Sequence, residues 1–174
     1  GPGSDNEYLA ASTVFEPPTK NIMKDLKEAL GREAVSKLIY GQPLSSKDPC
    51  AVHMKHSKDI VERFSQTPIN GGREDIEFRL PCHSGHTGHK DVYGRIKLAE
   101  SSNTMNTGCY NPSKGRFVHP WLNHGITLRH AARFQTFPDD FTFIGSLTNQ
   151  SKQIGNSVPP LLGMKLIKPI LKLF

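Results

Sequence analysis

Apolar residues recur every four positions through residues 20–40, "KNIMKDLKEALGREAVSKLIY", with charged residues between them. The repeating positions are Ile22, Leu26, Leu30, Ala34 and Leu38. This spacing predicts an amphipathic α-helix that turns one face to a core. Thr19 follows two prolines and suits the N-cap, whereas Gly31 weakens the middle of the helix. We expect a packing helix without chemistry of its own.

Two further segments have helical patterns. "SKDIVERFSQ" at 57–66 predicts a short helix, and "GITLRHAARFQTF" at 125–137 predicts another with Thr127 as its N-cap. Pro-Asp-Asp at 138–140 should end the second helix. Between them, "DVYGRIKL" at 91–98 has strand character, and "NTMNTGCY" at 103–110 could pair with it as a short irregular strand.

The C-terminal segment is unusually apolar. "KQIGNSVPP" at 152–160 predicts a Gly-Asn turn that opens into a helix over 157–174, with Ser157 as its cap and Pro169 as a kink or end. Lysines form one stripe, and apolar residues cover much of the rest: Leu161, Leu162, Leu166, Ile167, Ile170, Leu171, Leu173 and Phe174. So wide an apolar face needs more than one surface to pack against.

Composition places the chain among ordinary globular proteins. It has 174 residues, with 36% hydrophobic and 22% charged residues, enough for one domain with a core. There is no run of about 18 apolar residues and no apolar signal core at the start, so we expect an intracellular protein without a membrane partner. "GPGS" at 1–4 is interpreted as an expression scar. Cys50, Cys82 and Cys109 do not form a disulfide framework, which fits a reducing compartment.

The formal net charge of +6 favours an anionic partner, of which nucleic acid is the commonest. The basic excess gathers in residues 90–133, which hold only Asp91 and Glu100 as acids. The seven basic residues there are Lys90, Arg95, Lys97, Lys114, Arg116, Arg129 and Arg133. They indicate either a phosphate-tracking surface or a solvated charged face.

Two strings near the end carry a family resemblance. "GRFVHPWLNHGITLRHAARFQTFPDDFTF" at 115–143, followed by "QIGNSVPPLL" at 153–162, resembles the ninth and tenth motifs of DNA (cytosine-5) methyltransferases. "TPINGGREDIEFRLPC" at 67–82 resembles the beginning of the target recognition domain of those enzymes. Residues 88–120 resemble its end. The ninth motif departs from the usual Arg-Glu pair, because His130 follows Arg129 here, and Asn123-His124 stands where Asn-Arg is common.

The resemblance implies a two-lobed enzyme that methylates C5 of a cytosine flipped out of duplex DNA. In that family a large lobe binds S-adenosylmethionine and supplies a Pro-Cys-Gln nucleophile and a Glu-Asn-Val acid. This sequence has neither string and no glycine-rich loop near its start. The Pro81-Cys82 pair lies inside the recognition-like region and is followed by His83, not by glutamine. We therefore assign no catalytic residue and expect activity only with a complementary catalytic half, which would also be needed to bind the cofactor.

The expected fold class is α+β, with a small irregular β-rich target recognition domain, flanking helices, and a C-terminal helix that would complete a Rossmann-like catalytic domain. Residues 1–6 would be scar or disordered, and 7–66 a helical arm or linker. Residues 67–127 would form the recognition domain, and 128–174 the ninth- and tenth-motif helices.

Site residues follow from the same resemblance. The expected DNA-binding residues are Gly71, Gly72, Arg73, Arg95, Thr104, Lys114 and Arg116. Arg129 and Arg133, with Gln135, resemble residues that hold the recognition lobe in place, with structural ion-pairing as their expected role. Asn156, Ser157 and Val158 resemble the turn that lines the S-adenosylmethionine pocket, where a helix N-terminus suits an anionic group. A plain helix cap is the alternative for this turn.

Other interpretations stay open at this point. The chain could be a stand-alone, sequence-specific DNA-binding module without catalysis, and RNA could replace DNA. "CHSGHTGH" at 82–89, with Cys50, His53 and His56 upstream, offers zinc-ligand types, but its spacing fits no standard finger. We therefore assign no metal site and expect those histidines in loops near DNA phosphates.

Overall fold

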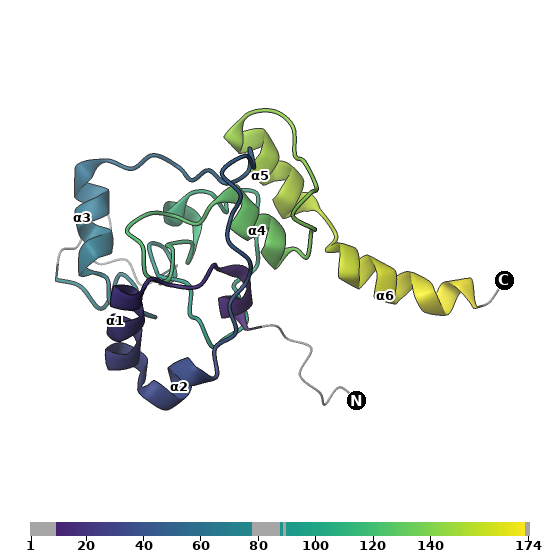
Figure 1. The fold of residues 1–174 in the computed structure, drawn as a ribbon. Coiled ribbons are helices and arrows are strands. Elements are labelled where there is room, and N and C mark those ends of the chain that lie inside the picture. Colours follow the sequence, from purple (N-terminus) through teal and green to yellow (C-terminus); the bar gives the residue numbers. More distant parts are fainter. Residues whose placement is uncertain (1–9, 78–87, 89, 173–174) are drawn as a thin grey trace.

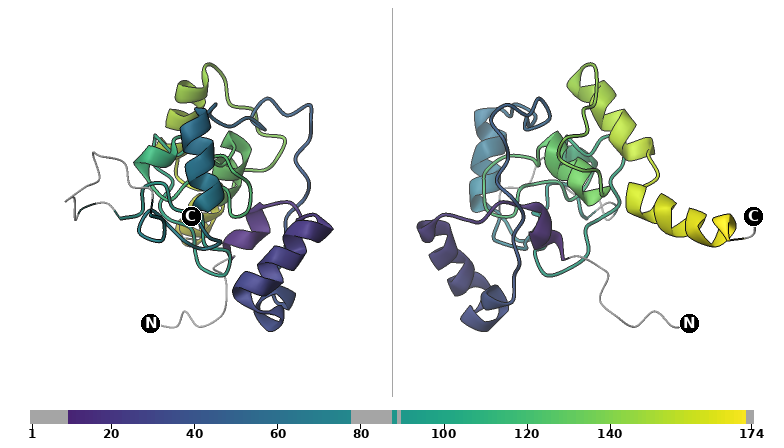
Figure 2. Two further views of the ribbon diagram at one scale, coloured as in Figure 1. Left: turned by 90° about the vertical axis from the view of Figure 1, so that its left-hand side faces the viewer. Right: turned by 45° about the vertical axis from the view of Figure 1, so that its right-hand side comes forward.

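The computed structural model describes residues 10–77, 88 and 90–172. Helices are the regular elements of this part of the chain (Figure 1). In order they are η1 (Ala11–Val14), α1 (Lys20–Leu30), α2 (Arg32–Ser36), α3 (Lys58–Gln66), η3 (Pro112–Lys114), α4 (Leu128–Phe134), α5 (Leu147–Asn156) and α6 (Pro160–Leu171). Irregular loops connect them and surround α4, while α1 and α3 lie at the periphery (Figures 1 and 2).

The predicted β-rich recognition domain is wrong, because the described residues form no β-strand. Only isolated bridges occur, where Val118 pairs with Arg95 and with Gly125. Ile96 and Leu98 are buried, so the alternating pattern of 91–98 did identify core positions. The backbone there turns at Gly94, whose N–H donates to the Asp91 carbonyl at 3.0 Å. The next two N–H groups, of Arg95 and Ile96, bond to two different segments, at Gly71 and Val118. These single bonds do not continue into a β-ladder.

The core forms between α4 and the loops that cover it. Leu128, Ala131 and Ala132 of α4 are fully buried, as are Phe117 and Ile126 just before the helix. The loops are held by single backbone bonds, for instance from the N–H of Ile126 to the carbonyl of Phe117 at 2.8 Å. α4 is thus the central element of the described fold, and the surrounding loops pack against its buried side chains.

The predicted helix over 20–40 is two helices. Thr19 caps α1 as expected, since its side chain accepts from the N–H of Ile22. Gly31 has φ of +85°, a left-handed conformation that ends α1 and that other residues adopt only with strain. Leu26 and Val35 remain buried on either side of the break. The predicted helix over 57–66 is confirmed as α3, with Ser57 at the N-cap position.

The Gly-Asn turn predicted at 152–160 is wrong, since "QIGN" forms the last turn of α5. Ser157 is the C-cap of α5 and its hydroxyl donates back to the Ile154 carbonyl at 2.6 Å. It is not the N-cap of the last helix, because α6 begins at Pro160 behind Pro159. Pro169 lies inside α6 and does not end it. The helix projects away from the rest of the chain (Figure 1).

Gly155 and Gly163 provide a matched pair of helical glycines. A Cβ on Gly155 would lie 2.4 Å from the backbone of Asn106 and Thr107, whereas one on Gly163 would meet nothing within 4 Å. We expect Gly155→Ala to lower the free energy of unfolding by about 1–3 kcal/mol, because backbone must move to admit the methyl group. Gly163→Ala should leave it unchanged or raise it by up to about 1 kcal/mol. Urea unfolding monitored by circular dichroism measures both. Equal effects would contradict the close packing of α5 on residues 106–107.

Candidate functional site

The residues expected to bind DNA differ sharply in exposure. Arg95 is buried, and its guanidinium donates to the carbonyls of Phe64, Thr67, His119 and Leu122 and to the Asn123 side chain, at 2.6–2.8 Å. Burial lowers the pKa of Arg95 to about 10, so the group is still charged at neutral pH. Arg95 therefore ties its own loop to the end of α3 and to the loop at 119–123.

Arg73 and Arg116 are also engaged within the chain. Arg73 is buried and donates to the Gly88 carbonyl at 2.8 Å. Arg116 bonds Asp91 and the carbonyls of Gly71 and Arg95 at 2.9–3.1 Å. Its guanidinium also limits the space beside Gly72, where an added Cβ would lie 3.2 Å from Nη2. These contacts organise the loops around residues 70–75 and 91–96.

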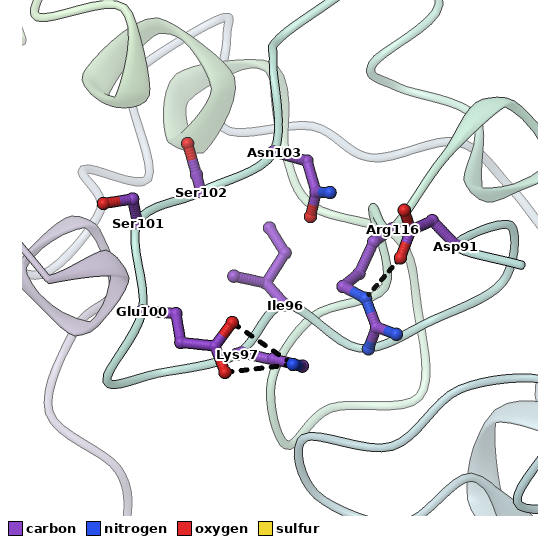
Figure 3. Close-up of a pocket in the computed structure, with 8 residues that line it drawn as sticks. All are labelled: Asp91, Ile96, Lys97, Glu100, Ser101, Ser102, Asn103 and Arg116. Atoms are coloured by element: carbon purple, nitrogen blue, oxygen red, sulfur yellow. Dashed lines mark hydrogen bonds and ion pairs between the residues drawn. The ribbon is translucent and has the colours of Figure 1, made fainter.

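Thr104 and Lys114 are the two expected DNA-binding residues with exposed side chains. Near them, Asp91, Ile96, Lys97, residues 100–103 and Arg116 line a polar cavity of about 130 Å³ (Figure 3). Its charges are paired, with Lys97 2.9 Å from Glu100 and Arg116 3.1 Å from Asp91. The cavity offers hydrogen-bond donors and acceptors without a net charge.

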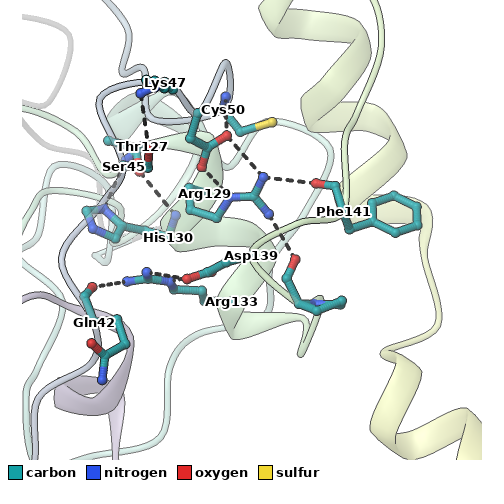
Figure 4. A network of polar contacts seen from close by, with 12 residues as sticks. Gln42, Ser45, Lys47, Cys50, Thr127, Arg129, His130, Arg133, Asp139 and Phe141 are labelled. Atoms are coloured by element: carbon teal, nitrogen blue, oxygen red, sulfur yellow. Dashed lines mark hydrogen bonds and ion pairs between the residues drawn. The ribbon is translucent and has the colours of Figure 1, made fainter.

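Arg129 anchors α4 to two distant loops (Figure 4). It is 2% exposed and bonds both carboxylate oxygens of Asp48, at 2.5 and 3.1 Å. It also donates to the carbonyls of Pro138 and Phe141. Burial would raise the pKa of Asp48, but the hydrogen bonds from Arg129 and the Cys50 N–H outweigh it and lower that pKa.

Arg133 and Gln135 extend the same anchoring. Arg133 bonds both carboxylate oxygens of Asp139, at 2.8 and 2.7 Å, and this hydrogen bonding lowers the pKa of Asp139. Its Nη1 donates to the carbonyl of Gln42 at 2.9 Å (Figure 4). It also donates to the carbonyl of Val14 at 2.9 Å. The Gln135 amide donates to the Ile154 carbonyl at 3.0 Å. α4 is therefore joined to the N-terminal segment, to loop 42–48 and to α5.

His130 completes the start of α4. The Thr127 side chain accepts from the His130 N–H at 3.1 Å, and His130 Nδ1 accepts from the Thr127 N–H at 3.3 Å. This is a capping box, in which His130 takes the place usually filled by Glu or Gln. The N-cap predicted at Thr127 is confirmed, and a histidine in the ninth motif keeps the helix start intact.

The turn expected to line a cofactor pocket joins α5 to α6. Asn156 and Val158 are exposed, so both side chains can meet a ligand or a partner. The Ser157 hydroxyl instead faces back into α5. At the start of α6 the Leu161 N–H donates to the Thr136 hydroxyl at 3.1 Å, which fixes the helix entry to the segment after α4.

The sequence does not indicate the side chains that pair with several of the expected site residues. Asp48 and Glu16 are the carboxylates that pair with Arg129 and His130 across 81 and 114 residues. Asn123 accepts from Arg95 in the same way. Of the possible zinc ligands, Cys82, His83, His86 and His89 lie outside the described residues. His53 stacks on His124 at 4.0 Å, and His56 accepts from the Gly125 N–H.

Comparisons with known proteins identify the family. The model of the C-5 cytosine-specific DNA methylase family matches residues 10–172, so the chain belongs to this family. The family resemblance drawn from the sequence is thereby confirmed.

Individual relatives agree. Type II methyltransferase M1.HphI of Haemophilus parahaemolyticus is 33% identical over 120 residues, which cover 69% of this chain and 30% of that protein. Type II methylase M.HgiDII of Herpetosiphon aurantiacus is 40% identical over 122 residues, covering 65% and 34%. DNA (cytosine-5)-methyltransferase PliMCI of Paracentrotus lividus is 37% identical over 91 residues, covering 49% and 5%. The chain thus spans about a third of the length of the two bacterial relatives. None of its described helices is long and apolar enough to cross a membrane.

Proposed function

We propose that this chain is the target-recognition and cofactor-pocket-completing part of a DNA cytosine-5 methyltransferase. It would work with a catalytic half that carries the Pro-Cys-Gln nucleophile. The substrate would be duplex DNA and the methyl donor S-adenosylmethionine. Family membership and the coverage of about a third of each bacterial relative support this function.

The observation that carries the proposal is the apolar surface of α6. No described residue of this helix is buried. Seven large apolar side chains are 47–67% exposed: Leu161, Leu162, Met164, Leu166, Ile167, Ile170 and Leu171. Completing their burial would contribute on the order of 5–10 kcal/mol to association. Because these residues surround much of the helix, the surface they require is a cleft in the catalytic half rather than a flat face.

Docking of α6 in this way would bring the adjoining α5–α6 turn against the catalytic half. Asn156 could hydrogen-bond and Val158 could pack against the cofactor, because both side chains are exposed. Ser157 is assigned no contact, since its hydroxyl is committed to Ile154. S-adenosylmethionine, when bound, would supply the methyl group and the catalytic half its nucleophile. The role of this chain would be to close the pocket.

On the DNA side, we assign direct contacts to Thr104 and Lys114 and supporting roles to the buried arginines. An exposed lysine can neutralise a phosphate and release its counterion. Arg95 and Arg116 would act indirectly, by holding the loops that carry the contacts. Gly71 and Gly72 lie in those loops, and the carbonyl of Gly71 accepts from Arg116.

Transfer of a labelled methyl group to mixed-sequence duplex DNA tests the proposal. The 174-residue chain, a catalytic half with the Pro-Cys-Gln string, and their mixture are assayed in parallel. We expect activity only in the mixture. Leu166→Glu should abolish it by placing a charge in the docking cleft, whereas Lys168→Glu, on the lysine stripe, should retain most of it. Activity of the chain alone would overturn the proposal. An inactive mixture together with tight, specific DNA binding would favour a stand-alone DNA-binding module.

A further inference from the structure

Three polar side chains from distant parts of the sequence meet beside α4. Glu16 follows η1, His119 lies in the loop before α4, and His130 lies in α4 itself. One nitrogen or oxygen atom from each lies within 4.8 Å of the others. Both imidazoles are buried, while the Glu16 side chain is 30% exposed.

The hydrogen bonds of the two histidines fix where their protons lie. His130 Nδ1 accepts from the Thr127 N–H, and His119 Nδ1 accepts from the N–H groups of Trp121 and Leu122 at 3.3 and 3.2 Å. A neutral imidazole that accepts at Nδ1 carries its proton on Nε2. Both rings are therefore Nε2–H tautomers, assigned from their partners.

These tautomers leave two N–H groups and one carboxylate in the same pocket. The Nε2 of His130 lies 3.0 Å from a carboxylate oxygen of Glu16. The Nε2 of His119 is buried and has no hydrogen-bond partner among the described residues. An imidazole that binds a metal through Nε2 needs its lone pair there and usually donates from Nδ1, the reverse of this arrangement. The cluster is therefore built to hold a carboxylate between two donors.

Glu16 is also the point where the N-terminal segment meets α4. Its neighbour Phe15 is fully buried, with ring centroids 4.8 Å from His119 and 4.7 Å from His130. On the other side, Arg133 donates to the Val14 carbonyl. A change at Glu16 would thus be transmitted directly to the helix that carries Arg129 and Arg133.

We propose that Glu16 is a positioning residue whose carboxylate accepts from the Nε2–H of His130 and, after a small side-chain movement, can also accept from the unpartnered Nε2–H of His119. It supplies from the N-terminal segment the carboxylate that a capping box usually carries at the position of His130. The inference depends on the proposed function in one respect: if α6 docks on a catalytic half, α4 would orient α6. It follows that one carboxylate can occupy this pocket, from position 16 or from position 130, but not two.

A variant cycle on the whole chain tests this coupling. His130→Glu should lower the melting temperature by about 6 °C, because two carboxylates then face each other, and Glu16→Gln by about 3 °C. The double variant should recover to within about 3 °C of the parent, since Glu at 130 can cap Thr127 and accept from His119. Combining His130→Glu with Glu33→Gln, on an exposed pair, should give no recovery.

Nitrogen NMR of the imidazoles provides a readout that general destabilisation would not change. Both rings should show the Nε2–H form at neutral pH. Simple addition of the two single losses, or an Nδ1–H form of either ring, would overturn the proposal. So would a rise in melting temperature with Zn²⁺ that His119→Ala removes, since that result would make the cluster a metal site. These measurements use the chain alone, so a failed methyl-transfer assay would not affect them.

Discussion

Replacing Arg95 with methionine is expected to lower the free energy of unfolding by on the order of 4 kcal/mol or more, enough to unfold much of the chain. Methionine keeps the unbranched apolar stem but removes all five hydrogen bonds of the guanidinium. Four of the acceptors are backbone carbonyls of Phe64, Thr67, His119 and Leu122. Each carbonyl left buried without a partner costs about 1–3 kcal/mol.

Urea unfolding of the two proteins measures the effect, and Lys97→Met is its matched control. Lys97 is partly exposed and, among the residues that the structure describes, pairs with Glu100 alone, so its loss should cost less than about 1 kcal/mol. A stable Arg95→Met variant that had lost DNA affinity would show that Arg95 reads or grips DNA directly. An unstable one leaves Lys114, whose side chain is exposed, as the better probe of phosphate contact.

Arg95 also shows why sequence alone misplaces charged side chains. A basic residue in a basic segment favours an anionic partner. Nothing local indicates that two carbonyls from 28–31 residues upstream and two from 24–27 residues downstream converge on it. The same applies to Asp48 and Glu16, whose partners on α4 lie far along the chain. Contacts of this kind depend on the tertiary arrangement and leave no spacing to detect.

Features determined by neighbouring residues were predictable. The caps at Thr19 and Thr127 and the helix at α3 depend on residues within one turn, and the structure has them. The pattern predicts only a weak point at Gly31, because glycine is compatible with both a continuous helix and the positive φ that the structure has there. The strands were predicted wrongly because a sheet depends on residues far apart in the sequence. Alternation marks which side chains are buried, but a sheet also needs a partner backbone, and the loops around Ile96 offer only single bonds.

Acid is expected to destabilise the chain well above the pH at which carboxylates titrate. Burial, the largest cause in each case, lowers the pKa of His56, His119, His124 and His130, that of His124 to about 4. Neighbouring imidazoles add to this, because protonating one ring disfavours protonating the next. The folded chain therefore keeps these rings neutral at pH values where the unfolded chain binds protons.

The sign follows from proton counting. Between pH 6.5, the ordinary value for histidine, and about 4, the unfolded state binds more protons, so the free energy of unfolding falls as the pH falls. For His124 alone the loss below pH 4 is on the order of 2 kcal/mol, because solvent screens the partly exposed ring. Glu16, Asp48 and Asp139 also have lowered pKa values, so their contribution is present above the ordinary carboxyl range and is lost in stronger acid.

Urea unfolding at a series of pH values from 7.5 down to 4.5 measures this loss, and His124→Asn is the informative comparison. That substitution removes one titrating ring from the stack with His53 and should make the pH dependence shallower, even though it lowers stability at pH 7.5. A free energy of unfolding that stayed flat from pH 7.5 to 5 would mean that water reaches the rings and that burial does not hold them neutral. A decline beginning only below about pH 4.5 would assign acid sensitivity to the carboxylates alone. The expected decline from pH 6.5 onward would instead make the histidine cluster the part of the fold that limits its stability in mild acid.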